Sequence, residues 1–324
     1  FWTISAIAKK LVLQDGEWTS AKLYQVLGAA IVGSLAYSFT DSFWYSAVES
    51  EVYSMSSLCT AVVFWLALKW DARADEADSN KWLLAIAYVM GLSIGVHLLN
   101  LLTIPVIALM IYFRKTSKVE WKGIAKSLGW GVLALAFVLW GVIQYSVRFA
   151  ANFDLFFVNS LGLPFGSGVA FFIALLVGGI VFGLYYASRK AKPIMHLALL
   201  SLSFIFLGFG SYSLLLIRAQ TNISLNNYDP DNAFNLLSYL SREQYQSEPL
   251  FKGQSFDARP IDMTTGSTYR KDADRYTKIS SNNRYVYDKE MLFPRIYSDK
   301  HAAFYRQYLN IPERQSPTMG DNLK

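Results

Sequence analysis

Residues 82–113 read WLLAIAYVMGLSIGVHLLNLLTIPVIALMIYF, and this apolar stretch decides how the chain folds. A membrane-spanning helix needs about 20 apolar residues, so one straight helix over 82–113 would be too long. It would also place Lys81 and the Arg114–Lys115 pair, which flank the stretch, on opposite sides of the membrane. Two short helices that turn at His97–Asn100 keep these basic residues on one side. Pro105 then falls just inside the second helix, where its missing N–H costs little.

Further apolar stretches on both sides of this segment predict additional membrane spans. They cover residues 1–8 (the end of a helix that is expected to begin upstream), 23–48, 52–70, 124–148, 168–188 and 194–217. With these spans, nearly all Lys and Arg residues of the loops fall on one side of the membrane. The positive-inside rule places that side in the cytoplasm. The loops at 44–51, 97–100 and 149–167, and the whole tail from Arg218, are then extracytoplasmic.

The composition agrees with a membrane protein. Hydrophobic residues make up 53% of the 324 residues and charged residues only 17%, against about 25% in typical soluble domains. This excludes a disordered or collagen-like chain, and the concentration of apolar residues before residue 217 argues against a single soluble globule. We therefore expect an all-α polytopic membrane domain over 1–217, of about seven spans or half-spans, and an extracytoplasmic polar segment over 218–324. The net charge of +6 follows from membrane orientation and does not point to nucleic acid as a partner.

The segment 218–324 is expected to be a mixed, Tyr-rich structure that packs on the outer face of the membrane domain. Its basic and acidic residues nearly balance. Residues Asp231–Tyr245 predict a helix with Asp231 as its N-cap, and His301–Leu309 predict a second short helix. Residues 252–285 are rich in turn-forming residues, and the sequence does not decide whether they are ordered. The sequence contains no Gly-rich phosphate loop, so no nucleotide site is expected.

Glu49 and Glu51 are the first candidates for chemistry. They follow the aromatic cluster Phe43–Tyr45 at the predicted outer interface of the membrane, where aromatic residues are common. Carboxylates at membrane depth are costly, and for that reason they are functional candidates. The alternative is that both are solvated acids of the interface without a role in chemistry.

His97 and Asn100 lie at the predicted turn between two apolar helices. The imidazole of His97 could bind phosphate, relay a proton or ligate a metal. Alternatively, the two side chains only cap the turn. No second His lies nearby and Cys59 is the only cysteine, so the sequence predicts no metal site and no intrachain disulfide.

The outer loop at 149–167 and the start of the tail supply three more candidates. Asp154 and Asn159 precede the stretch LGLPFGSG at 161–168, whose Gly and Pro residues predict a turn of defined shape. Arg218 stands at the outer end of a span, where an Arg can bind phosphate through two hydrogen bonds or anchor the helix by snorkelling. A purely structural role is the alternative for all three.

The order of several motifs along the chain is more specific than any single residue. FWYSAVESEVY at 43–53, GLSIGVHLLNLLTIP at 91–105 and VNSLGLPFGSG at 158–168 are followed by LLSYLSREQY at 236–245 and PRIYS at 294–298. Together they resemble a bacterial family of polytopic proteins that was long catalogued as a domain of unknown function. That family is now grouped with protein O-mannosyltransferase-like membrane proteins of the GT-C glycosyltransferase class. The resemblance covers nearly the whole chain.

The resemblance implies a GT-C-like helical bundle in the bacterial inner membrane that takes a sugar, with mannose as one candidate, from a polyprenyl-phosphate carrier. The acceptor would be a Ser or Thr hydroxyl of an exported protein at the outer face. Such transfer needs a carboxylate base near the acceptor hydroxyl, and positive charge from Arg or a divalent cation at the departing phosphate. In these enzymes the acidic catalytic motif lies in the first external loop.

We expect that loop to precede residue 1, because the chain opens with Phe1-Trp2, without Met or a signal peptide. The chain is then an internal fragment that would be inactive alone, and no catalytic base is assigned. Seven residues are expected to bind or support substrate: Glu51, Glu49, His97, Asn100, Arg218, Asp154 and Asn159. Of these, Glu51 and His97 are expected to face one outer cavity and position the acceptor or the lipid phosphate, while Arg218 offsets phosphate charge.

Three other functions stay open. A glycosyltransferase of the same fold could act on a lipid or a cell-surface polymer instead of a protein. A transporter or channel would need ionisable residues deep within several spans, or helices broken at the midplane, and the sequence offers mainly Asp41. A non-catalytic scaffold would use the tail as a binding surface for exported proteins.

Overall fold

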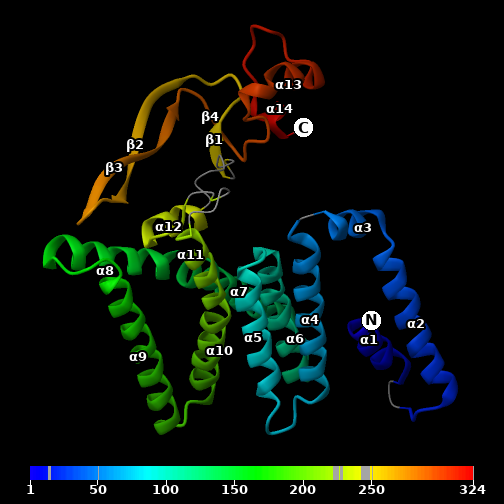
Figure 1. Cartoon of the computed structure of the whole chain (residues 1–324). Coiled ribbons are helices and arrows are strands. Elements are labelled where there is room, and N and C mark those ends of the chain that lie inside the picture. The colour runs from blue at the N-terminus through cyan, green and yellow to red at the C-terminus, as the bar shows by residue number, and fades with distance from the viewer. Residues whose placement is uncertain are drawn as a thin grey trace. The chain divides into compact units, whose positions relative to one another are not determined.

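The computed structural model describes residues 1–13, 16–49, 51–221, 226, 229–241, 249 and 251–323. The described chain is mostly helical, with a small sheet-containing region near its C-terminal end (Figure 1). It divides into two compact units. The first comprises Phe1–Phe149 and Ala170–Leu225, and the second comprises Ala150–Val169 and Asn226–Lys324. The prediction of a helical membrane protein with a mixed C-terminal segment is confirmed.

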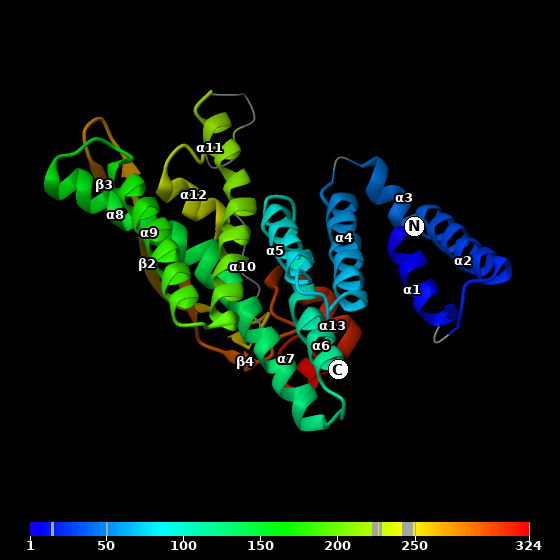
Figure 2. The same cartoon turned by 90° about the horizontal axis from the view of Figure 1, so that it is seen from below.

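Helices dominate the first unit because a chain in lipid must satisfy its backbone hydrogen bonds internally. They are α1 (Trp2–Leu13), α2 (Ser20–Ser38), α3 (Asp41–Val48), α4 (Tyr53–Ala72), α5 (Asn80–Ile94), η1 (Leu98–Leu102), α6 (Thr103–Lys115), α7 (Trp121–Ala136), η2 (Phe137–Tyr145), α9 (Ser167–Arg189), α10 (Pro193–Phe209), η3 (Gly210–Tyr212) and α11 (Ser213–Ala219). α8 (Ser146–Leu161) continues η2 into the second unit. Figures 1 and 2 show α4, α5 and α6 side by side, and α10 packs against α5.

Four helical stretches of the described chain are long and apolar enough to cross a membrane. They are Leu98–Lys115, Trp121–Leu161, Ser167–Arg189 and Pro193–Ala219. α2 and α3 meet the same criterion together, but a bend of 64° separates them. α5 is apolar but shorter. The chain is therefore a multi-pass membrane protein.

The predicted break within 82–113 is present, because α5 ends at Ile94 and the next helical turn begins at Leu98. The stretch 23–48, predicted as one span, is instead divided between α2 and α3. The Thr40 hydroxyl at this bend donates to the Tyr37 carbonyl (2.8 Å), and such local bonds compete with helix continuation.

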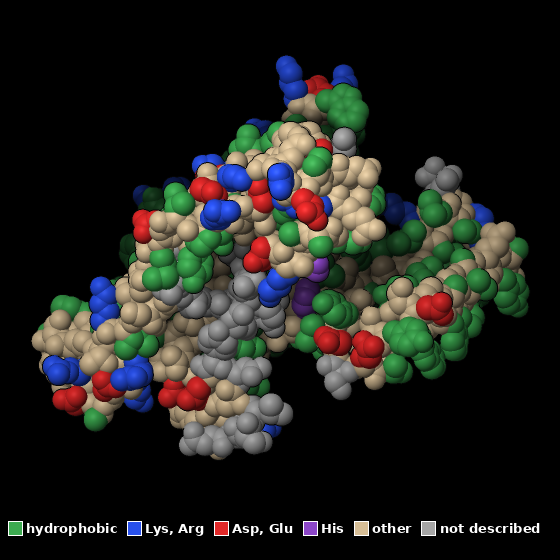
Figure 3. Space-filling model, turned by 90° about the horizontal axis from the view of Figure 1, so that it is seen from above, with side chains coloured by type: hydrophobic (Ala, Val, Ile, Leu, Met, Phe, Trp, Pro, Cys, Tyr) green, Lys and Arg blue, Asp and Glu red, His purple; other side chains and the backbone are tan. Residues whose placement is uncertain are grey.

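Apolar side chains cover the surface of the membrane helices, as expected for contact with lipid. Along α9 the exposed ones include Phe171, Ile173, Leu175, Val177, Val181 and Phe182. Figure 3 shows hydrophobic side chains along the segment that contains α1–α3, whereas Lys, Arg, Asp and Glu are intermixed over the C-terminal segment. The two parts of the chain therefore meet different surroundings, lipid for the first and water for the second.

Helices α5 and α10 cross closely at two glycines. A Cβ added to Gly91 would lie 2.3 Å from the carbonyl oxygen of Ile205, and one added to Gly208 would lie 2.5 Å from the amide nitrogen of Leu92. Side chains cannot approach a backbone this closely, so the crossing requires glycine on both helices. It lies in the last turns of α5, directly before the turn that carries His97.

The second unit begins with part of α8 and also contains α12 (Ala233–Leu240), β1 (Lys252–Gln254), β2 (Pro260–Lys271), β3 (Tyr276–Tyr287), β4 (Glu290–Leu292), η4 (Asp299–His301), α13 (Ala302–Leu309) and α14 (Met319–Leu323). β1 pairs with β4 and β2 pairs with β3, both antiparallel. The predicted helix at His301–Leu309 is confirmed as α13, with His301 at its N-cap.

Residues 252–285, whose order the sequence left open, contain β1, β2 and most of β3, because Thr, Tyr and Ile favour strands and the turn-forming residues only close the hairpin. One prediction for the tail was wrong. The N-cap of α12 is Asn232 rather than Asp231, since Asn232 Oδ1 accepts from the amides of Phe234 and Asn235. Residues 242–245, at the end of the predicted helix, lie outside the described residues.

We expect Gly91→Ala to lower the stability of the folded chain by about 1–3 kcal/mol, because the added Cβ would collide with the Ile205 carbonyl. The measurement is the melting temperature of the purified chain in detergent. Gly178→Ala on α9 is the matched control, since nothing lies within 4 Å of its added Cβ. Equal melting temperatures for the two variants would contradict the close crossing.

Candidate functional site

Tyr53 and His97 bring two of the sequence motifs together in the first unit. Tyr53 is the first residue of α4, two positions after Glu51, and its ring centre lies 5.3 Å from that of the His97 imidazole. His97 Nδ1 accepts a hydrogen bond from the Leu99 amide (3.1 Å), which caps η1. The neutral imidazole then carries its proton on Nε2, and this is the nitrogen that can donate to a ligand.

Asn100 is fully buried and shapes the same turn. Its Nδ2 donates to Ser93 Oγ (3.0 Å), and Ser93 Oγ donates to the Met90 carbonyl (2.8 Å). Its backbone carbonyl accepts from the Thr103 hydroxyl (2.7 Å). Asn100 Oδ1 has no hydrogen-bond partner among the described residues. The geometry thus supports the capping role that the sequence left open for His97 and Asn100.

Glu49 and Glu51 are both exposed. The backbone N–H of Glu49 ends α3 by donating to the Tyr45 carbonyl (3.0 Å), and Glu51 lies in the link before α4. In the part of the chain that the structure describes, no ion pair involves either carboxylate. The rings of Phe39 and Trp44 stack across the bend between α2 and α3, with centres 5.7 Å apart. Exposure of this kind suits a solvated interface acid and equally a carboxylate that meets substrate.

Arg218 lies exposed in the last turn of α11. η3, which precedes α11, packs against the end of α5, where a Cβ added to Gly95 would lie 3.1 Å from Ser211 Oγ. His97 therefore follows the C-terminal end of α5, and Arg218 follows the C-terminal end of α10, after η3 and in α11. Among the described residues no hydrogen bond or ion pair joins Arg218 to His97 or Glu51.

Asp154, Asn159 and Tyr276 form a hydrogen-bonded clamp in the second unit. Asp154 is only 1% exposed, and its Oδ2 accepts from the Tyr276 hydroxyl (2.8 Å) and the Gly166 amide (3.1 Å). Its Oδ1 accepts from the Gly168 amide (3.0 Å). Asn159 pairs with the backbone of Tyr276, donating from Nδ2 to the carbonyl (2.8 Å) and accepting the N–H at Oδ1 (2.9 Å). Both predicted site residues lie on α8 and not in a loop, because the helix runs to Leu161, and together they hold one residue of the tail.

The surroundings of the clamp indicate a structural role. The rings of Phe165 and Phe234 pack on Tyr276 with centres 5.0 and 5.1 Å away, in a core that includes Ala151 and Val158. Burial, and then the hydrogen bond to Asp154, raises the pKa of the Tyr276 hydroxyl, so this hydroxyl stays protonated and keeps donating. For Asp154 and Asn159 the structural alternative is the one that the contacts support.

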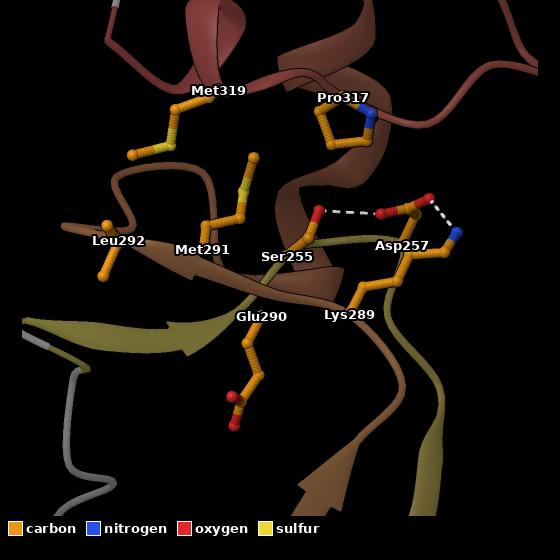
Figure 4. Close-up of a pocket in the computed structure, with 8 residues that line it drawn as sticks. All are labelled: Ser255, Asp257, Lys289, Glu290, Met291, Leu292, Pro317 and Met319. Atoms are coloured by element: carbon orange, nitrogen blue, oxygen red, sulfur yellow. Dashed lines mark hydrogen bonds and ion pairs between the residues drawn. The ribbon is translucent and has the colours of Figure 1, made fainter.

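A pocket of about 430 Å³ lies elsewhere in the second unit (Figure 4). Asp257 at one end accepts hydrogen bonds from Lys289 (2.7 Å) and Ser255 (2.7 Å). Met291, Leu292, Pro317 and Met319 supply apolar lining, and Figure 4 shows Glu290 on the opposite side of β4 from Met291. Because the charged groups satisfy each other, the pocket offers mainly apolar contact. Sequence reasoning missed it, since the partners Asp257 and Lys289 are 32 positions apart.

Two family models match parts of the chain. Residues 1–120 match the N-terminal domain of protein O-mannosyl-transferase TMEM260. The resemblance to O-mannosyltransferase-like membrane proteins is thereby confirmed for this range. The range holds the whole α3–α4 link and the turn before α6, and thus the predicted site residues Glu49, Glu51, His97 and Asn100.

Residues 246–324 match a family of unknown function (DUF8416). This range contains all four strands and the pocket beside Asp257. A search of curated proteins and a search of solved structures found no match. Residues 1–120, matched by the first model, therefore belong to the first unit, and residues 246–324, matched by the second, belong to the second unit.

We expect Asp154→Ala to destabilise the chain by about 3 kcal/mol, because it leaves the buried Gly168 amide and the buried Tyr276 hydroxyl without an acceptor. Tyr276→Phe removes a single hydrogen bond and should cost about 1 kcal/mol. Thermal unfolding in detergent and limited proteolysis across the β2–β3 hairpin measure both effects. Tyr269→Phe is the control, because it keeps the ring contact with Phe234. An unchanged melting temperature for Asp154→Ala would contradict a stabilising role for the clamp.

The Asp257 carboxylate should make the second unit sensitive to acid. Burial raises its pKa, but hydrogen bonds from Lys289, Ser316 and Ser255 outweigh burial and lower the pKa from 3.8 to about 2. A depressed pKa stabilises the fold above the unfolded value, and this contribution is lost as the pH falls through the folded value. We discount it to about 1–2 kcal/mol, because the Lys289 side chain is 44% exposed.

Asp257→Asn should therefore lower the melting temperature at pH 7, and its difference from the unaltered chain should shrink between about pH 4 and pH 2. The control is Glu290→Gln, which removes an exposed ion pair with Lys252 and should have little effect at any pH. A difference that is independent of pH would contradict the role of the Asp257 charge.

Proposed function

We propose that the chain is part of a membrane glycosyltransferase that moves a sugar from a polyprenyl-phosphate donor to a Ser or Thr hydroxyl of an exported protein. The reaction would take place at the outer face of the bacterial inner membrane, with the C-terminal segment on that side. The match of residues 1–120 to the N-terminal domain of a protein O-mannosyl-transferase carries this proposal. Mannose is accordingly the first sugar to test.

In the proposed transfer, the acceptor hydroxyl oxygen bonds to the anomeric carbon of the sugar while the bond from that carbon to the carrier phosphate breaks. The phosphate leaves with the bonding electrons, and a carboxylate base takes the hydroxyl proton. Positive charge beside the phosphate stabilises the transition state. We assign no residue of this chain as the base.

Glu51 and His97 are proposed to position the acceptor or the lipid phosphate. The contact between Tyr53 and His97 supports this role, because it links the segment after Glu51 to the His97 turn within the first unit. Nε2 of His97 can donate to a phosphate oxygen, and the exposed Glu51 carboxylate can accept from a hydroxyl. Arg218 or a divalent cation would offset the charge of the leaving phosphate.

Glu51→Gln in the gene that encodes this chain should reduce hexose-bearing Ser/Thr peptides of exported proteins at least about tenfold, since misplaced reactants slow transfer strongly. Mass spectrometry of exported proteins from the native host measures this. The intact gene, a deletion and the variant are compared, and membrane levels of the protein are checked. Glu120→Gln is the matched control, because Glu120 is an exposed glutamate on the predicted cytoplasmic side.

The four strains, with the intact gene, the deletion, Glu51→Gln and Glu120→Gln, separate the possible outcomes. Loss in the deletion and in Glu51→Gln, with Glu120→Gln unchanged, supports protein glycosylation and a role for Glu51. Loss only in the deletion keeps the activity and removes Glu51 from the site. Unchanged glycopeptides in every strain would rule out an exported protein as the acceptor. Cell-surface lipids and polymers would then be compared in the same strains.

A further inference from the structure

A groove of about 610 Å³ lies where the start of α5 meets the turn between α9 and α10. All of its lining belongs to the first unit. The polar part of its lining consists of Ser188, Lys192 and His196. Its apolar wall consists of Leu84, Leu197 and Leu200. No predicted site residue lies here, and the proposed sugar transfer belongs to the opposite side of the membrane.

The geometry of the turn holds Lys192 at this groove. Ala191 adopts the left-handed conformation with φ of 50°, and the Lys192 amide then donates back to the Ala187 carbonyl (2.9 Å). The Lys192 ammonium lies 5.0 Å from the centre of the Tyr186 ring. The fold of the turn thus places the Lys192 backbone at the groove, and the contact with the Tyr186 ring places its ammonium.

The positive charge at this turn is not neutralised within the described chain. No carboxylate there lies within ion-pairing distance of Arg189, Lys190, Lys192 or His196. The end of α4 and the α4–α5 loop precede the groove, but their acids are paired elsewhere: Asp71 with Lys10, Asp75 with Arg114, Glu76 with Arg73 and Asp78 with Lys81. An anion in the groove would meet uncompensated charge.

We propose that the groove binds an anionic phospholipid, with its phosphate at Lys192 and His196 and an acyl chain along the apolar wall. The positive-inside rule places this turn in the cytoplasm, and the cytoplasmic leaflet is the one that commonly carries anionic lipid. A soluble anion would use the cations but not the three leucines. A zwitterionic lipid would use the leucines but leave the net positive charge unmatched.

The test is native mass spectrometry of the whole chain in detergent, with equal amounts of phosphatidylglycerol and phosphatidylcholine added. We expect the chain to retain phosphatidylglycerol at least about fivefold more than phosphatidylcholine, which corresponds to one cation near a membrane surface. Lys192→Ala combined with His196→Ala should abolish this preference. Lys118→Ala combined with Lys122→Ala removes two lysines of the same predicted side outside the groove and should leave the preference unchanged.

Ser188→Trp provides a second variant that fills the groove and keeps its charge, and it should also lose the retained lipid. Melting temperatures establish that each variant is folded. Equal retention of the two lipids by the unaltered chain would overturn the proposal, and so would an equal loss in the Lys118/Lys122 control. Displacement of phosphatidylglycerol by inorganic phosphate alone would also overturn it, because the groove would then recognise an anion without its acyl chain.

Discussion

The crossing of α5 and α10 at Gly91 and Gly208 is the contact on which both ends of the first unit depend. Between apolar helices in lipid the hydrophobic effect contributes little, so close backbone packing takes over the role that side-chain burial has in water. At one end of the pair, α5 stops at Ile94 and passes into the turn of His97. At the other end, the starts of both helices form the groove beside Lys192.

The second unit is stabilised by a different kind of contact. Its two-stranded sheets are too small to bury a large core, and long hairpins of this kind need something to pack against. Asp154 and Asn159 supply that support by satisfying both the side chain and the backbone of Tyr276. A buried carboxylate is tolerated here because three donors surround it: the Tyr276 hydroxyl, the Gly166 amide in the turn before α9 and the Gly168 amide in the first turn of α9.

Much of the membrane domain followed from sequence because the length of an apolar run and the charge of its flanks act locally. The break near His97 was predictable on those grounds. The bend at Thr40 was not, since it depends on one side-chain hydrogen bond. Asp154 and Asn159 were identified as important, but their partner Tyr276 lies 122 and 117 positions away, and no local pattern reports such a contact. The sequence left the order of residues 252–285 open, because turn-forming residues obscured the strand-forming residues of the β2–β3 hairpin.

The distribution of unsatisfied polar atoms bears on where this protein works. Four buried side-chain atoms have no hydrogen-bond partner among the described residues: Ser56 Oγ on α4, Trp82 Nε1 on α5, Asn100 Oδ1 on η1 and Ser167 Oγ at the start of α9. Each such group costs about 1–3 kcal/mol, and an apolar residue of similar size would avoid that cost. Two of the four, Ser56 Oγ and Asn100 Oδ1, belong to the elements that the contact between Tyr53 and His97 joins. Polar residues kept against stability are expected where function, rather than packing, decides the residue type. For Ser56 and Asn100, which lie on these two elements, that argument agrees with the proposal that Glu51 and His97 position substrate.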